Sequence, residues 1–368
     1  MTPNMGADGN AAMETAAALA NELKKMVDRA ESGKPSYDSI KAHLGNYPKL
    51  RDTLLTAVLK AADDLTRIYA PRALKDKILV FYVIPNGGDI WQSLTFLTDA
   101  GIMYSILLIE SARRANIMTL SYAPVLLGYN MQFFGVGVLM ALWCMVHYVQ
   151  TPIQNFRARD MRLTDLSYTA SVLPVILLTH YIPNSLSFAE WLDPQYRHMA
   201  NWLWQPFPVW TTILQFVLKQ TVMPDTVKED RIKNPDRDLP VIKYTIYSLC
   251  TISTATWWYT LYSAPFSPAQ LFVPDISAAK TGDEFTRLFL QFDEIFCLGS
   301  CFLWLLYLFG DLRRAGMMEN SWVSIVGRGL ATTVVAGPGV AIGLGWWWRE
   351  QLLATKWHKD AVMAGKTK

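Results

Sequence analysis

Two adjacent carboxyl groups inside an apolar stretch offer the clearest chemistry in this sequence. Asp293 and Glu294 stand in the run FLQFDEIF at residues 289–296, with apolar and aromatic residues on both sides. Because desolvation and mutual repulsion disfavour two neighbouring anions in such surroundings, we expect at least one to remain a neutral carboxylic acid. A neutral acid can donate a proton. A purely structural interpretation is one carboxylate near a membrane surface, paired with Arg287 or Lys243.

Three further ionisable residues in apolar stretches are candidates for catalysis. Asp99 lies inside the first stretch and has no cation nearby in the sequence. Glu110 ends that stretch, and its i, i+4 spacing to Arg114 also predicts an ordinary ion pair on a helix surface. His147 is followed by a tyrosine, as is His180, which is typical of interfacial aromatic belts but also allows a role as a base. We keep Asp99, Glu110 and His147 as catalytic candidates beside the carboxyl pair.

Aromatic residues are the second chemical signal, because ring faces attract cations and exclude water. The candidates for substrate binding are Trp204, Phe207, Trp257, Trp258, Tyr259, Phe296 and Trp304. Belt and packing roles explain many membrane aromatics, and we accept that interpretation outright for residues 346–348.

The composition indicates which elements must position these residues. Of the 368 residues, 51% are apolar and only 18% are charged, against about 25% charged in a soluble domain. This excludes a disordered chain, a nucleic-acid binder and a secreted disulfide scaffold. The apolar stretches of bilayer length are 89–110, 121–149, 165–183, 202–220, 240–263, 285–309 and 322–348. They predict an all-α integral membrane bundle of about seven transmembrane helices.

The chain divides into three predicted parts. Residues 1–84 are expected to form a cytoplasmic extension with amphipathic helices near 11–31 and 50–69. Residues 85–349 form the predicted catalytic bundle, and 350–368 a polar tail. Alternate connections carry nine and four basic residues, with Arg113 and Arg114 on the poorer side. The positive-inside rule then predicts a cytoplasmic N-terminus, and we expect the endoplasmic reticulum membrane. The lysines of the C-terminal tail oppose this orientation.

Cofactor and metal sites find little support. Cys297 and Cys301 share a helix face, but no histidine stands at ligand spacing, and buried cysteines usually act as small apolar residues. In the loops at 157–165 and 224–238, acids could hold Mg²⁺ on a diphosphate. Basic residues interleave with those acids, so salt bridges that tie the two loops together are favoured. DDxxD, P-loop, HExxH and GxSxG motifs are absent, and we expect neither a metal nor a cofactor.

Several segments resemble fungal integral-membrane terpene cyclases of meroterpenoid biosynthesis, of the macrophorin and ascochlorin or ascofuranone type. The segments are IESARR (109–114), HYVQTP (147–152), DMRLTD (160–165), THYIP (179–183), WQPFP (204–208) and the loop 224–240. The resemblance covers about residues 85–310. It implies metal-independent cyclisation of the farnesyl chain of a prenylated aromatic or quinone-like substrate, begun by protonating a terminal epoxide or olefin. The acids of that family are not aligned to positions here, so the site residues above come from the residue-level argument.

Other classes of function remain open. A second lipid- or isoprenoid-modifying enzyme, such as an Mg²⁺-dependent prenyltransferase, is the nearest alternative. A transporter would need polar, water-lined helices, and a scaffold would use residues 1–84 as a docking face. The expected partners are the farnesylated aromatic substrate, membrane lipid and associated pathway enzymes, with no nucleic acid.

Overall fold

The computed structural model describes residues 88–221, 234–275 and 282–359. Within these ranges the chain is helical and contains no β-strand, apart from one isolated bridge between Arg113 and Thr164. The all-α class is therefore confirmed for the described residues. Of the described residues, those within 83–131 and 136–368 belong to one compact unit. The predicted helices of the N-terminal extension lie outside the described residues.

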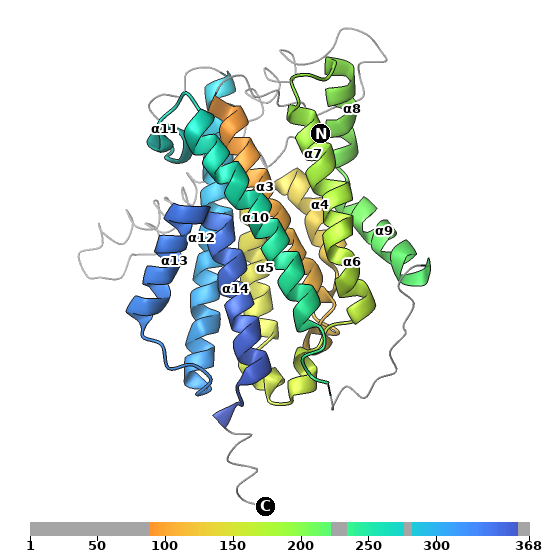
Figure 1. Cartoon of the computed structure of the whole chain (residues 1–368), viewed down its shortest axis with the longest axis vertical. Helices are drawn as coiled ribbons and strands as arrows, with labels where there is room; N and C mark the ends of the chain where they lie inside the picture. The colour runs from red at the N-terminus through yellow and green to blue at the C-terminus, as the bar shows by residue number, and fades with distance from the viewer. Residues whose placement is uncertain (1–87, 222–233, 276–281, 360–368) are drawn as a thin grey trace, which may run out of the picture. The chain divides into compact units, whose positions relative to one another are not determined.

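Helix α3 (Gly88–Ser111) is the central helix of this unit. It packs against α10 (Leu239–Ser263), α12 (Gly282–Arg314) and α14 (Pro338–Thr355) (Figure 1). Of the apolar window of α3, 83% is buried inside the protein, against 50% and 44% for the two other long apolar segments. Residues on all sides of α3 therefore face protein, which explains why so many of its polar side chains find partners there.

The structure corrects the predicted number of membrane spans. Among the described residues, three segments are long and apolar enough to cross a bilayer: 90–111, 166–188 and 287–314. The predicted span 121–149 is broken into α4 (Pro124–Phe134) and α5 (Val136–Gln150). Hydropathy averaged over a long window does not register such a break, because the glycine at the break is itself only weakly polar.

The predicted span 322–348 is likewise broken, into α13 (Trp322–Ala336) and α14. Both breaks occur at a glycine with positive φ, Gly135 at 88° and Gly337 at 101°. Such backbone conformations strongly favour glycine, because a side chain would clash with the backbone. Each break also starts a new helix, α5 and α14, whose first amide groups need acceptors from elsewhere in the protein.

These breaks reverse the direction of the chain. The amide of Leu120 donates to the side chain of Gln150 (2.9 Å), so the segment between them ends where it began. Arg313 lies over the ring of Trp322 (5.2 Å), and the amide of Lys359 donates to Ala315 (3.0 Å). The pair α13 and α14 therefore also leaves and returns to the same end of α12.

The alternation of loops behind the predicted orientation is consequently wrong at its first connection. Arg114 pairs with Asp160, so Arg113 and Arg114 share an end with the basic loop 157–162 instead of facing the opposite side. The start of the C-terminal tail lies at that end too, through Lys359. Because the helix count failed at 121–149, Arg113 and Arg114 were assigned to the wrong side. The loop 157–162 and the start of α10 do share an end, as predicted, through the Arg162–Asp238 pair.

The predicted span 165–183 forms a single interrupted helix. It consists of α6 (Leu166–Ile176), the π-helical turn η6 (Leu177–Tyr181) and α7 (Ile182–Phe188). The side chain of Asp165 accepts from the Tyr168 amide and caps the start of α6. Pro174 lies inside α6 and removes one backbone donor, and the wider turn follows three residues later.

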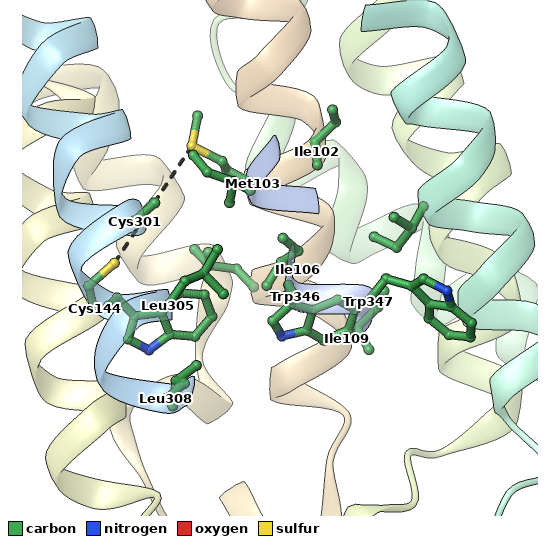
Figure 2. Close-up of a cluster of buried hydrophobic side chains, with 14 of the residues drawn as sticks. Ile102, Met103, Ile106, Ile109, Cys144, Cys301, Leu305, Leu308, Trp346 and Trp347 are labelled. Atoms are coloured by element: carbon green, nitrogen blue, oxygen red, sulfur yellow. Dashed lines mark hydrogen bonds between the residues drawn. The ribbon is translucent and has the colours of Figure 1, made fainter. Parts of the chain in front are cut away.

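The remaining helices complete the unit. They are α8 (Pro194–Trp204), α9 (Phe207–Thr221) and α11 (Pro268–Phe272), with short 3₁₀ turns η2 (Arg114–Asn116), η3 (Leu120–Tyr122), η4 (Ile153–Phe156) and η5 (Arg159–Arg162). The 3₁₀ turns join the ends of α3, α5 and α6, and they carry several of the charged residues described below. Figure 2 shows the apolar core, where α3, α5, α12 and α14 meet around residues such as Met103, Cys301 and Trp346.

Gly339 allows α14 to approach α3 closely, which gives a first prediction. A Cβ at this position would overlap the Asp99 carboxyl group. We expect Gly339→Ala to destabilise the protein by about 1–3 kcal/mol, seen as a lower thermal midpoint in detergent. Gly327→Ala in α13, where a Cβ would meet nothing within 4 Å, is the matched control and should not lower the midpoint, because alanine favours a helix interior over glycine. Equal midpoints for the two variants would contradict the close packing.

Candidate functional site

The Glu110 carboxylate, at the end of α3, is the centre of a buried charge network. Its Oε2 accepts hydrogen bonds from Arg113 Nε (2.7 Å) and Asn116 Nδ2 (2.9 Å). Its Oε1 accepts from Trp346 Nε1 (2.9 Å) and Arg349 Nη1 (3.2 Å). Glu110 itself is fully buried. Both oxygens are thus saturated with donors, which stabilises the ionised form of the carboxyl group.

The predicted surface pair between Glu110 and Arg114 is wrong. Arg114 is partly exposed and pairs with Asp160 (2.7 Å) instead. Helix α3 ends at Ser111, so residue 114 no longer lies on the helix face that carries Glu110. Arg113 turns inward in its place.

Further charges extend this network across four parts of the chain. Arg113 Nη2 lies 2.9 Å from Glu350, and Arg349 Nη1 lies 2.9 Å from the same side chain. Arg162, in η5, pairs with Asp238 at the start of α10 and reaches Glu350 at 3.4 Å. All of these side chains are buried. We call the set Glu110, Arg113, Arg162, Asp238, Arg349 and Glu350 the charge cluster.

The charge cluster contains three carboxylates and three guanidinium groups, so its formal charges cancel. Burial alone would lower the pKa of Arg113, but the neighbouring Glu110 and Glu350 outweigh it and raise that pKa above its ordinary value. The Arg113 guanidinium group therefore stays charged at any pH at which the protein is folded. The Arg162–Asp238 pair also confirms the prediction that salt bridges join the two polar loops.

His147 joins the charge cluster from α5. Its Nε2 lies 3.4 Å from Glu110 Oε2, and its Nδ1 accepts from Trp304 Nε1 (3.2 Å). Since Nδ1 is the acceptor, a neutral imidazole carries its proton on Nε2, facing Glu110. The structure thus brings together three predicted site residues, Glu110, His147 and Trp304. His147 is fully buried, so the interfacial-belt interpretation of this residue is wrong.

A second polar cluster lies in the other half of the protein, around the predicted acids. Asp293 accepts from the amides of Val136 (3.1 Å) and Gly137 (2.8 Å), which begin α5. It pairs with neither Arg287 nor Lys243, so that structural alternative is wrong. Asp293 instead satisfies the helix start that follows the break at Gly135.

Asp99 does the same for α14. Its Oδ2 accepts from the Gly339 amide (2.9 Å), and its Oδ1 accepts from the Ser253 hydroxyl group. Glu294 differs from both: among the described residues its hydrogen bond comes from the side chain of Gln92, with 3.1 Å between Nε2 and Oε2. Asp99 and Asp293 both lie near enough to act electrostatically on Glu294. The three predicted acids therefore form one region, but two of them have structural partners.

His180 occupies the π-helical turn and holds three helices together. It is fully buried, its Nε2 lies 2.7 Å from the Leu97 carbonyl, and its Nδ1 accepts from Trp204 Nε1 (3.0 Å). Trp204 stacks on Phe207, with ring centroids 5.9 Å apart. These contacts give His180, Trp204 and Phe207 a packing role.

The predicted substrate-binding aromatics do not line one space. Trp257 stacks on Phe272 (5.2 Å), whereas Trp258, Tyr259 and Phe296 are about half exposed. Trp304 belongs to the buried group around His147. Trp346, taken as a belt residue, is fully buried and bonds Glu110. Ring residues spread over four places cannot form the common wall that the sequence interpretation required.

Sulfur atoms fill part of the core between these two polar regions. Cys144 and Cys301 lie 3.9 Å apart, and Cys301 lies 3.8 Å from the Met103 sulfur (Figure 2). All four cysteines are free and buried. Within the described residues, no group of three or more His, Cys, Asp or Glu side chains has the arrangement of a metal site.

A cavity of about 440 Å³ opens at the ends of α5 and α12. Tyr148, Gln154, Asp311, Arg314 and Lys359 are among its lining residues. Seventeen helical residues separate Glu294 from Asp311 on α12, a rise of roughly 25 Å. The cavity therefore does not reach Glu294 or the adjacent Asp293.

The sequence interpretation missed several residues that the structure places at the centre of these clusters. Arg349 and Glu350 were assigned to the boundary of a polar tail, yet α14 continues to Thr355 and buries both. Gln92 was overlooked because an uncharged amide near the start of an apolar stretch is unremarkable. Its distance of three residues from Thr95 and seven from Asp99, on one face of α3, was the available signal.

Comparison with known proteins now adds to this geometry. The CtvD domain matches residues 78–354. The chain belongs to the CtvD domain family. No solved structure matches it.

Among curated proteins, the chain is similar to three that are named FAD-dependent monooxygenases. These are verC1 of Penicillium polonicum (30% identity over 98% of this chain and 60% of the relative), anuJ of Penicillium roqueforti (38%, 77% and 35%) and BOA8 of Botryotinia fuckeliana (26%, 97% and 56%). The chain thus spans between 35% and 60% of the length of each relative.

These relatives overturn the terpene cyclase interpretation. They are fungal, as the resemblance implied, but their names describe flavin-dependent oxygenation and not a metal-independent cyclisation. The segments behind the resemblance explain the error. IESARR and DMRLTD contain Glu110, Arg113 and Arg162, which the structure shows to be members of the charge cluster.

The described helices of this CtvD domain chain do not fit FAD. Dinucleotide sites commonly use a GxGxxG turn between a strand and a helix, whose N-terminus receives the pyrophosphate. The 368 residues contain no GxGxxG, and the described ranges contain no strand. The two glycine-preceded helix starts, α5 and α14, already receive the Asp293 and Asp99 carboxylates. A phosphate there would meet like charge.

Adjacent arginines give a test of the charge cluster. We expect Arg113→Gln to cost about 3–5 kcal/mol, because it leaves Glu110 and Glu350 without a buried partner. Arg114→Gln removes only a partly exposed ion pair and should cost at most about 1 kcal/mol. Thermal unfolding of both variants in detergent measures the difference. Similar midpoints for the two would show that the cluster does not stabilise the fold.

Proposed function

We propose that this chain forms the membrane-embedded, substrate-holding part of a fungal FAD-dependent monooxygenase system. In this proposal the flavin is bound outside the helices described above. The observation that carries the proposal is the alignment: nearly the whole chain is similar to verC1 and BOA8, yet it accounts for little more than half of each. The rest of those relatives has room for a flavin-binding domain.

The described helices support the membrane part of this proposal. Three segments have the length and hydropathy of bilayer spans, and apolar side chains such as Leu126, Phe216 and Val334 are largely exposed. Exposed apolar surface of this kind fits contact with lipid. A lipophilic small molecule dissolved in the bilayer, with the endoplasmic reticulum as the proposed membrane, is the substrate class that such a bundle would receive.

In this proposal the flavin and the described helices have different chemical roles. A bound flavin would supply oxygen activation, which no described residue provides. The described residues hold helices and polar groups in place: Asp99 and Asp293 fix two helix starts, and the charge cluster closes one end of the bundle. Glu294 and Gln92 remain as polar groups with capacity to contact a bound molecule.

Co-expression tests this function. The full chain would be produced in a fungal host with and without the part of verC1 to which it does not align. We expect that flavoprotein to sediment with membranes only when the chain is present, and ¹⁸O from ¹⁸O₂ to enter lipophilic products only then. An unrelated membrane protein of similar size is the control. Unchanged sedimentation together with unchanged ¹⁸O incorporation would contradict the proposal.

A flavin measurement on the purified chain locates the cofactor. The chain alone, released from detergent and denatured, should yield far less than one FAD per polypeptide by chromatography. A stoichiometric yield would place the flavin on this chain and contradict the proposed division of labour.

A further inference from the structure

Glu294 and Gln92 form a buried polar pair away from the charge cluster, and one of their atoms lacks a hydrogen-bond partner. Gln92 is fully buried and donates its amide nitrogen to Glu294. Its amide oxygen, Gln92 Oε1, accepts no hydrogen bond from the described protein. Turning the amide over would leave its nitrogen unpaired instead. Either way, one buried polar atom requires a partner, and such atoms are rare in native proteins.

Neighbouring groups do not supply that partner. The hydroxyl group of Thr95 donates to the backbone carbonyls of Gln92 and Trp91. Asp99 and Asp293 are occupied by the starts of α14 and α5. Gln291, one turn before Glu294, donates to the carbonyls of Gln270 and Leu271 and so fixes α11. The polar groups around the pair are therefore engaged elsewhere.

The surroundings restrict the kind of molecule that fits. In the orientation that the structure shows, the unpaired atom is the acceptor Gln92 Oε1, so the missing group is a hydrogen-bond donor. Asp99 and Asp293 add negative charge nearby, which disfavours an anion. Trp91 packs on Tyr259 of α10 with ring centroids 5.4 Å apart, and Tyr259 is 57% exposed. An aromatic surface open to lipid thus adjoins the residue next to Gln92.

We propose that Gln92 and Glu294 bind the hydroxyl group of a lipophilic alcohol or phenol, which donates a hydrogen bond to Gln92 Oε1. The proposal rests on the proposed function only in taking this molecule to be the substrate. The pair then selects for an O–H donor, and the rest of the molecule lies among apolar and aromatic residues.

The test compares two probes that differ only in the donor. The full chain in phosphatidylcholine nanodiscs is labelled with a diazirine-bearing alkylphenol, and 4-dodecylphenol or its methyl ether competes. We expect the phenol to compete at about tenfold lower concentration than the ether, the effect of one buried hydrogen bond. The label should map to α3 near Trp91 or to α12 near Glu294. Equal competition, or a label elsewhere, overturns the proposal.

A matched pair of glutamines provides the variants. Gln92→Leu should abolish the difference between phenol and ether. Gln215→Leu should preserve it, although Gln215 is also fully buried with an unpaired amide oxygen, because it has no carboxylate partner. If only a water molecule binds Gln92, the preference will be equal in the wild-type chain and in Gln92→Leu, which overturns the proposal.

The design stays decisive if Gln92→Leu fails to fold, because the wild-type competition and the position of the label are sufficient. Failure of the inference is also distinguishable from failure of the proposed function. Loss of ¹⁸O incorporation with an intact phenol preference would fault only the function. Normal ¹⁸O incorporation without that preference would fault only the binding site.

Discussion

The contact between Glu110 and its two arginines, Arg113 and Arg349, is the constraint on which one end of the protein depends. A carboxylate removed from water is costly unless donors replace its hydration. Four side chains donate to Glu110, two from the loop after α3 and two from α14. The end of α3, the loop after it and the last helix must therefore meet at fixed positions, and Asp238 and Arg162 extend the same requirement to α10.

In the other half of the bundle, carboxyl groups accept hydrogen bonds from backbone amides instead of from arginines. Helices that begin inside a protein expose amides that need acceptors. Here two aspartates from facing helices supply them, Asp293 to α5 and Asp99 to α14. Acids at membrane depth are often taken as functional. In this protein two of three serve as helix caps, and the third is recognisable because its partner is a side chain.

The sequence was sufficient to predict the helical class and the burial of the acidic residues. It was not sufficient to predict what those acidic residues contact. Hydropathy gave α3, the segment 166–188 and α12 nearly correctly. It failed at Gly135 and Gly337, since averaging over twenty residues conceals one glycine with positive φ. Two partners of Glu110 also lay beyond any local pattern, because Trp346 and Arg349 are 236 and 239 residues away, whereas Arg113 and Asn116 are close in sequence. Local spacing therefore suggested Arg114 for a contact that tertiary structure determines.

The bond between Asp99 and Gly339 has a consequence for biosynthesis. Its two residues are 240 positions apart, and the Ser253 hydroxyl group is 154 positions from Asp99. Ribosomes deliver a chain from its N-terminus, so α3 is made while neither partner exists. Its aspartate must first be accommodated by water, lipid headgroups or chaperones, then by a serine, and last by the amide that opens α14. The final helix thus completes the environment of the first one described.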